Sequence, residues 1–153
     1  MSYNLSGKYY EDLNVDDEFV TCGRVITDAD IMVFGTLTGD WHPLHFNEDY
    51  AKKGPFGKRI AHGFLTLTIS VGEIQRMGWW DGTVLAFLGL NNVKLTAPVF
   101  VGDTIYARST IKEKRETKNP ERGTITQAVR IMNQDDKEVG SYEMTFLWAR
   151  EKS

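Results

Sequence analysis

The groups in this 153-residue chain that can do chemistry gather in one segment, residues 38–63. All three histidines, His42, His45 and His62, lie there together with Asp40. A carboxylate with imidazoles suits zinc or non-haem iron. A carboxylate with one imidazole can instead hold and activate a water, because histidine titrates near neutral pH while aspartate stays charged. A polar loop without chemistry is the third interpretation.

The pattern favours acid–base chemistry over metal binding. Pro43 interrupts the segment, no two histidines stand four residues apart, and no known ligand spacing is matched. A metal site would use Asp40, His42 and His45, whereas acid–base chemistry requires only that Asp40 and His45 converge. We therefore expect a site without metal or cofactor.

The flanking residues predict how these groups are placed. Thr27 and Asp30 form a variant capping box and Gly39 suits a left-handed helix end, so a helix should stop just before Asp40. The apolar face of that helix would consist of Ile31, Phe34 and Leu37.

Pro43 indicates a loop after this helix, because it lacks a backbone donor and favours an extended His42. Asn47 can then cap a short helix through Ala51. His45 would be held two residues before that helix start.

A basic loop follows at 52–59, where two glycines and a proline predict turns. Its cations are Lys52, Lys53, Lys58 and Arg59. They suit the phosphate groups of a ligand, although a solvated surface loop is an equal interpretation.

Residues 63–77, GFLTLTISVGEIQRM, support two structures. Apolar and small polar residues alternate, which predicts a strand. No charge occurs between Gly63 and Gly72, which also suits a helix buried on all sides. If a helix begins at Gly63, its first amides lack intrahelical partners and can stabilise an oxyanion.

The rest of the chain indicates an antiparallel sheet within a single domain that spans 1–153. Residues 18–26 are rich in β-branched side chains and predict a first strand after an amino-terminal arm at 1–17. Alternation and turn signals between 83 and 149 predict a meander of about four or five strands.

Composition sets further limits. The net charge of −3 argues against a broad nucleic-acid-binding face. The single cysteine, Cys22, cannot form an intramolecular disulfide and is expected to be a small buried hydrophobe. The first residues match neither a secretory nor a transit signal, and no run reaches the roughly 18 apolar residues of a membrane span. We therefore expect a cytoplasmic protein that binds no membrane.

Two blocks of the sequence resemble one protein family. TGDWHPLHFNEDYA followed by RIAHGFLTL looks like the hydratase motif of the MaoC-like dehydratases, the R-specific enoyl-CoA hydratases. LTAPVFVGDTI, at 95–105, is similar to their strand–turn–strand signature. The resemblance implies an α+β hot-dog fold, an antiparallel β-sheet wrapped around a long central α-helix, and makes 63–77 that helix. It also implies a homodimer or a higher homo-oligomer.

The resemblance further implies site residues and a reaction. Asp40 and His45 match the catalytic pair and Gly63 the oxyanion-hole amide, whereas His42 stands where these enzymes usually have asparagine. His62 would be a structural or capping residue and not a third catalytic group. The implied reaction is the reversible addition of water to a trans-2-enoyl thioester in fatty acid metabolism. The substrate would be an acyl-CoA or acyl-carrier-protein thioester, with His42 and the four cations of the basic loop in its binding site.

Three rival functions stay open. A hot-dog thioesterase would direct water to the thioester carbonyl, and a non-catalytic hot-dog protein would only bind acyl-CoA. A metal-dependent enzyme would use the aspartate and two histidines. Trp41, Trp79 and Trp80 would line an acyl tunnel or belong to the core.

Overall fold

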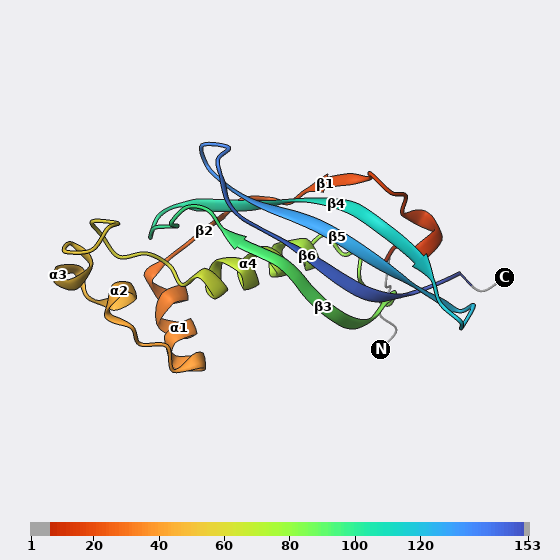
Figure 1. The fold of residues 1–153 in the computed structure, drawn as a ribbon, viewed down its shortest axis with the longest axis horizontal. Helices are drawn as coiled ribbons and strands as arrows, with labels where there is room; N and C mark the ends of the chain where they lie inside the picture. The colour runs from red at the N-terminus through yellow and green to blue at the C-terminus, as the bar shows by residue number, and fades with distance from the viewer. Residues whose placement is uncertain (1–6, 152–153) are drawn as a thin grey trace.

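The computed structural model describes residues 7–151, in which one long helix lies against one antiparallel sheet (Figure 1). The helix, α4, runs from Gly63 to Gln75. The sheet has the strand order β1-β4-β5-β6-β3, and β2 pairs with β4 outside that path. The strands are β1 (Glu18–Val20), β2 (Arg24–Val25), β3 (Val84–Leu95), β4 (Thr104–Glu116), β5 (Arg122–Asn133) and β6 (Glu138–Ala149). The expected α+β architecture is confirmed.

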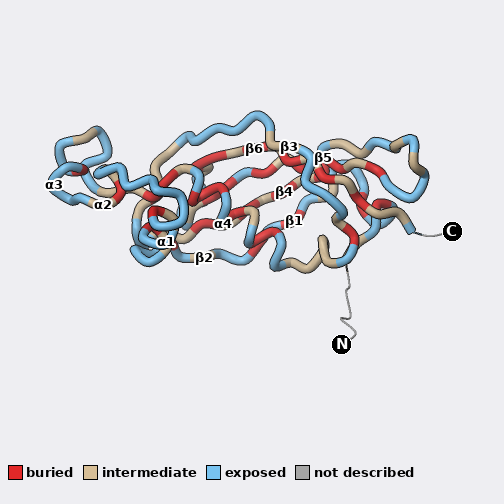
Figure 2. The backbone as a smooth tube through the Cα atoms, turned by 90° about the horizontal axis from the view of Figure 1, so that it is seen from below, coloured by how far each residue is buried: buried red, intermediate tan, exposed pale blue. Residues whose placement is uncertain are grey.

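The core lies between α4 and the inner face of the sheet. Residues of β4, β5 and β6 alternate between buried and less buried positions, as the pleat of a strand with one covered face requires. In Figure 2 the buried stretches follow α4 and these strands, while the chain around α3 is mostly exposed. Fully buried strand residues include Ile105, Ile111, Ile125, Ile131 and Trp148.

Residues 63–75 are helical although their local pattern has a period of two. Leu65, Leu67 and Ile74 pack into the core, so tertiary burial overrides the strand preference. The expectation that this helix is buried on all sides is wrong for the isolated protomer. Phe64 is 72% exposed, because α4 covers the sheet with one face and turns the other away from it. Within residues 7–151 no helix is long and apolar enough to cross a bilayer.

The amino-terminal part differs from the expectation in two ways. Residues 18–26 form two short strands, β1 and β2, separated at 21–23, instead of one. Cys22 lies at this break and is exposed, so the expectation of a buried thiol is wrong. Of the expected arm at 1–17, residues 1–6 lie outside the described part, and a 3-10 helix (Tyr10–Asp12) packs its Tyr10 into the core.

Three helices lie together at one end of the molecule, beyond the sheet (Figure 1). They are α1 (Asp28–Thr38), α2 (Pro43–Phe46) and α3 (Glu48–Ala51). The capping box of α1 and its left-handed end at Gly39 are confirmed. Its expected apolar face is only partly correct, because Leu37 is 81% exposed.

Candidate active site

Asp40 follows the end of α1 directly. Gly39 has a φ of 77°, a conformation that glycine adopts without strain, and it turns the chain away from the helix axis. The Asp40 backbone N–H donates to Thr38 Oγ1 at 3.3 Å, and the His42 N–H donates to Asp40 Oδ1 at 3.3 Å. These bonds hold the carboxylate at the start of the turn that leads into α2.

Residues 43–46 form the short helix α2, so the loop expectation is wrong there, whereas His42 itself lies outside the helix with a ψ of 130°. Pro43 occupies the first helical turn, where its missing N–H costs nothing. The Leu44 N–H donates to His42 Nδ1 at 3.2 Å, so the imidazole is the N-cap of the helix. An asparagine side chain offers an acceptor for the same purpose, which explains how histidine can replace it.

His45 lies on α2 and is buried, with 9% of its surface exposed. Its Nδ1 lies 2.8 Å from the Ile60 carbonyl oxygen. Because a carbonyl can only accept, Nδ1 carries the proton and donates, and Nε2 keeps its lone pair. Burial lowers the pKa of His45, and the Ile60 carbonyl and the Asp40 charge oppose this only in part. The ring is therefore set up as a base at neutral pH.

His62 precedes α4 and is only 2% exposed. Its ring stacks on that of His45, with centroids 3.8 Å apart and planes inclined by 28°. Its Nε2 lies 3.0 Å from the Asp40 carbonyl oxygen, so Nε2–H is the donor. The helix α2 and the segment that precedes α4 thus meet at one pair of rings.

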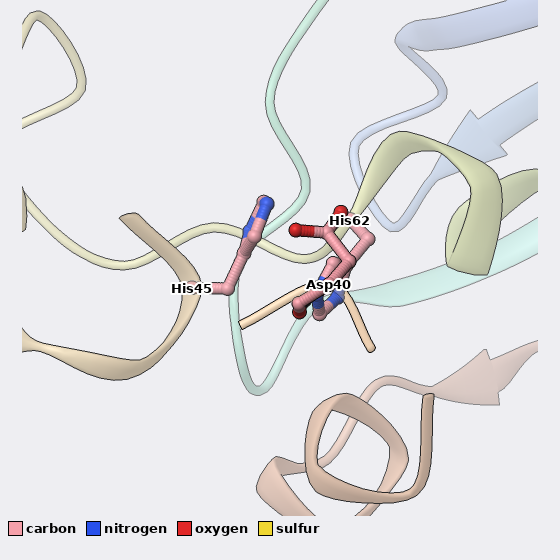
Figure 3. Close-up of side chains that lie close together, drawn as sticks. All are labelled: Asp40, His45 and His62. Atoms are coloured by element: carbon pink, nitrogen blue, oxygen red, sulfur yellow. Dashed lines mark hydrogen bonds between the residues drawn. The ribbon is translucent and has the colours of Figure 1, made fainter. Parts of the chain in front are cut away.

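Asp40, His45 and His62 converge, each with one donor atom within 4.8 Å of the others (Figure 3). A carboxylate and two imidazoles are a plausible zinc donor set. However, imidazole lone pairs lie in the ring planes, and stacked rings inclined by only 28° do not direct them at one ion. The convergence of Asp40 with His45 instead fits the acid–base arrangement.

Gly63 is the first residue of α4 and lines a cavity of about 300 Å³ beside His45. A side chain here would overlap Leu95 Cδ1, so glycine allows close approach to the backbone. The first amides of the helix carry the positive end of its dipole. The other residues around the cavity are mostly apolar: Phe56, Ile60, Ala61, Thr66, Leu95, Thr96, Ala97, Pro98, Val99 and Val139.

The four cations of the basic loop have different surroundings. Lys52 and Lys53 are exposed, and Lys52 makes only a 3.9 Å ion pair with Asp49. The Lys58 ammonium lies 3.9 Å from the Phe100 ring centroid. These three lysines remain candidates for phosphate contacts.

Arg59 differs from the three lysines of the same loop. Its guanidinium is paired at 2.8 Å with both Asp28 and Glu48. Its pKa is raised, chiefly by the hydrogen bond to Glu48. Two carboxylates therefore compete with any phosphate for this side chain.

The tryptophans considered for an acyl tunnel, Trp41, Trp79 and Trp80, do not line this cavity. Trp79 packs on Phe19 at a centroid distance of 4.3 Å, and Trp80 packs on Phe146 at 4.6 Å. Trp41 is half exposed. Core packing is thus the better interpretation for Trp79 and Trp80.

Sequence reasoning missed the contacts of His62 and the carbonyl of Ile60. Ile60 lies 15 residues from His45, and His62 lies 22 residues from Asp40. No local sequence pattern identifies contacts over such separations. The histidine directly before Gly63 was the one available signal.

Comparison with known proteins agrees with the fold. Residues 13–131 match the family model of the MaoC-like domain. A solved structure from Archaeoglobus, titled a monoamine oxidase regulatory protein, has a TM-score of 0.89 and 32% identity, and covers 95% of this chain and 97% of that one. A Mycobacterium tuberculosis protein described as a double hot-dog fold has a TM-score of 0.84 at 17% identity, over 99% of this chain and 47% of that one.

This domain therefore has the hot-dog fold, and the chain belongs to the family of MaoC-like domains. An (R)-specific enoyl-CoA hydratase from Rhodospirillum rubrum is 36% identical over 107 residues, which are 67% of this chain and 69% of the relative. Protein MaoC from Klebsiella aerogenes is 35% identical over 107 residues, 70% of this chain. The match spans only 31% of that Klebsiella protein.

Proposed function

We propose that this protein is an R-specific enoyl-CoA hydratase, a hydro-lyase that also dehydrates 3-hydroxyacyl thioesters. The observation that carries the proposal is the convergence of Asp40 with His45, together with the apolar cavity that His45 and Gly63 both line. The name of the Rhodospirillum relative supports this choice of reaction.

In this proposal Asp40, His45 and the Gly63 amide each have a different role. The thioester carbonyl accepts a hydrogen bond from the amide at Gly63, while Asp40 and His45 hold one water against the β-carbon. His45 Nε2 takes a proton from the water as its oxygen attacks, and the electron pair of the double bond moves toward the thioester oxygen. The helix amide stabilises the resulting enolate, and the α-carbon then takes up the proton that His45 removed from the water, which restores His45 as a free base. Dehydration follows the same steps in reverse.

We propose that the coenzyme A or carrier-protein part of the substrate lies on the side of the basic loop, residues 52–59. Phe56 belongs to this loop and lines the cavity, so the loop that carries Lys52, Lys53 and Lys58 adjoins the cavity through Phe56. These side chains suit the phosphates of coenzyme A and equally the acidic surface of a carrier protein. Rates with CoA-bound and carrier-bound enoyl groups of one chain length separate the two.

The test is hydration of a panel of trans-2-enoyl-CoA esters, followed by the loss of conjugated-alkene absorbance and the configuration of the alcohol formed. Asp40→Asn keeps the shape of the side chain but removes its charge, and should lower kcat by about 10²- to 10⁴-fold. The matched control is Asp135→Asn, in the exposed turn between β5 and β6, which should leave the rate unchanged. Full activity of Asp40→Asn, or release of free thiol instead of hydration, contradicts the proposal.

A further inference from the structure

His62 contacts both residues of the acid–base pair, which a residue that only precedes a helix need not do. It precedes α4 but caps it with no side-chain hydrogen bond. Both of its contacts within the site go to the acid–base pair, through a hydrogen bond to the main chain of Asp40 and through stacking on His45. The same residue also precedes Gly63 and so adjoins the helix amides.

The hydrogen bond fixes the main chain from which the carboxylate extends. His62 Nε2–H donates to the Asp40 carbonyl at 3.0 Å, across 22 residues of sequence. Asp40 is itself exposed and follows a helix end, and its hydrogen bonds with Thr38 and His42 are local to that turn. This bond ties the carboxylate to the start of α4.

The stacking fixes the plane of the His45 ring. A single hydrogen bond from Nδ1 to the Ile60 carbonyl tolerates some tilt of the ring, whereas a flat neighbour at 3.8 Å restricts that tilt. Phe34 and Phe46 flank His62 in turn, with ring centroids 4.8 and 5.6 Å away. His62 is thus a fixed surface for its neighbour.

The tautomer of His62 also matters to its neighbour. Since Nε2 holds the proton, Nδ1 carries a lone pair, and this atom is buried without a partner among the described residues. The hydrogen bond to Asp40 therefore fixes which nitrogen of His62 faces the main chain. The other ionisable groups that act on His45 are Asp40 and His42.

We propose that His62 is a positioning residue, which holds the Asp40 carboxylate and the His45 ring in register with the amide of Gly63. The proposal rests on the hydratase function and names the group that aligns its catalytic pair. His62 takes no proton and touches no reacting atom in this arrangement.

Two substitutions separate the two contacts. His62→Gln places an amide N–H near the position of Nε2 and keeps the donor, but removes the stacked ring. His62→Phe keeps a flat ring and removes the donor. A matched control is Tyr142→Phe, which removes a buried 2.9 Å hydrogen bond to Ser70, farther along α4, and leaves the site untouched.

Each His62 variant should lose kcat on the order of 10- to 100-fold while KM changes little, because misplacement of reacting groups slows the chemical step more than binding. In His62→Gln the acid limb of kcat/KM should move to higher pH, since loss of the ring admits water to His45. Tyr142→Phe should lower the Tm without moving this limb. Wild-type kcat and an unmoved acid limb in both His62 variants would overturn the proposal.

A second measurement does not depend on activity. The chain has three histidines, so their ring resonances can be assigned by NMR with His42→Asn and His45→Gln as references. The titration midpoint of His45 should rise in His62→Gln and stay near the wild-type value in Tyr142→Phe. If the wild type hydrates no enoyl thioester, the proposed function fails, yet this midpoint still decides whether His62 controls His45. An unchanged midpoint with activity lost only in proportion to Tm would mean a purely structural role.

Discussion

At the scale of single residues, each histidine of the site has one nitrogen committed to the backbone. His45 donates to Ile60 and His62 donates to Asp40, while His42 accepts from Leu44. These commitments set the tautomers, and the tautomers decide which ring can accept a proton. Only His45 combines a free Nε2 with a position beside the cavity.

The pH dependence of the reaction should reflect the burial of His45. Burial disfavours the charged imidazolium and lowers the pKa of His45 below the usual histidine value of about 6.5. A base acts only when it is unprotonated, so the rate should persist below pH 6.5 and fall as pH drops through the lowered pKa. The measurement is kcat/KM against pH in constant ionic strength, with His45→Gln as the inactive reference. An acid limb centred above 6.5 would argue against His45 as the base.

Substitutions at His42 test whether its main role is to cap α2. His42→Ala should cost about 0.5 to 1 kcal/mol, because the Leu44 N–H loses its acceptor. His42→Asn should restore most of that stability and retain the rate, since asparagine caps equally well. Urea unfolding and steady-state kinetics measure the two effects. A large rise in KM for His42→Asn would instead favour direct contact with substrate.

The residue types at the site could be predicted from sequence, whereas their partners could not. Asp40, His45 and Gly63 stood out by spacing and by resemblance to a known motif. The contact of His62 with Asp40 spans 22 residues and depends on how α4 docks beside α2, which no local pattern encodes. Cys22 was misjudged for a similar reason, because composition does not reveal where a strand breaks.

At the scale of elements, α4 combines two glycines with different surroundings. At Gly63 an added Cβ would meet Leu95, and at Gly72 it would meet nothing within 4 Å. Gly63→Ala should lower kcat about 10²- to 10³-fold, because the methyl group and the displaced Leu95 obstruct the oxyanion site. Its Tm should change little, since the half-exposed Leu95 side chain can rotate away.

Gly72→Ala is the control within the same helix. It should raise stability by about 0.5 to 1 kcal/mol through helix propensity and leave the rate unchanged. Thermal unfolding and kinetics of the two variants give the comparison. Equal loss of rate in both would mean that the helix as a whole, and not its first amide, governs activity.

Arg59 connects elements and need not bind substrate. It pairs with Asp28 at the start of α1 and with Glu48 at the start of α3. Arg59→Met should lower stability by about 1 kcal/mol with little change in KM. Lys52→Met and Lys53→Met should raise KM at low salt and leave Tm unchanged, because both side chains are exposed. The reverse pattern would place Arg59 on the substrate phosphates.

Whether α4 is a helix or a strand could not be decided from its local sequence pattern. The alternating residues 65–71 satisfy a strand pattern, the absence of charge also suited a buried helix, and the family resemblance decided for the helix. Burial of Leu65, Leu67 and Ile74 against the sheet decides between the two. Capping residues were more informative, since Thr27, Gly39 and Asn47 each occupy the predicted positions.

At the scale of the whole molecule, the two edges of the sheet differ. On one edge β1 is only three residues long, while on the other β3 has twelve residues and pairs with β6 on one side only. The exposed large apolar residues of β3 are Leu85, Phe87, Leu88, Val93 and Leu95. A long apolar edge with unpaired backbone groups favours pairing with another chain. We therefore propose a homodimer in which β3 meets its counterpart in a second copy.

Leu88→Lys tests this arrangement, because a charge at the middle of β3 opposes strand pairing. The variant should sediment as a monomer and lose the dependence of Tm on protein concentration that a dimer shows. Val20→Lys, on the opposite edge strand β1, is the matched control and should stay dimeric. Because Leu95 is exposed on β3 and also lines the cavity, the second copy would lie beside the site, and monomeric Leu88→Lys should also have a raised KM. A variant that remains dimeric, or a wild type that is monomeric at all concentrations, would exclude assembly through β3.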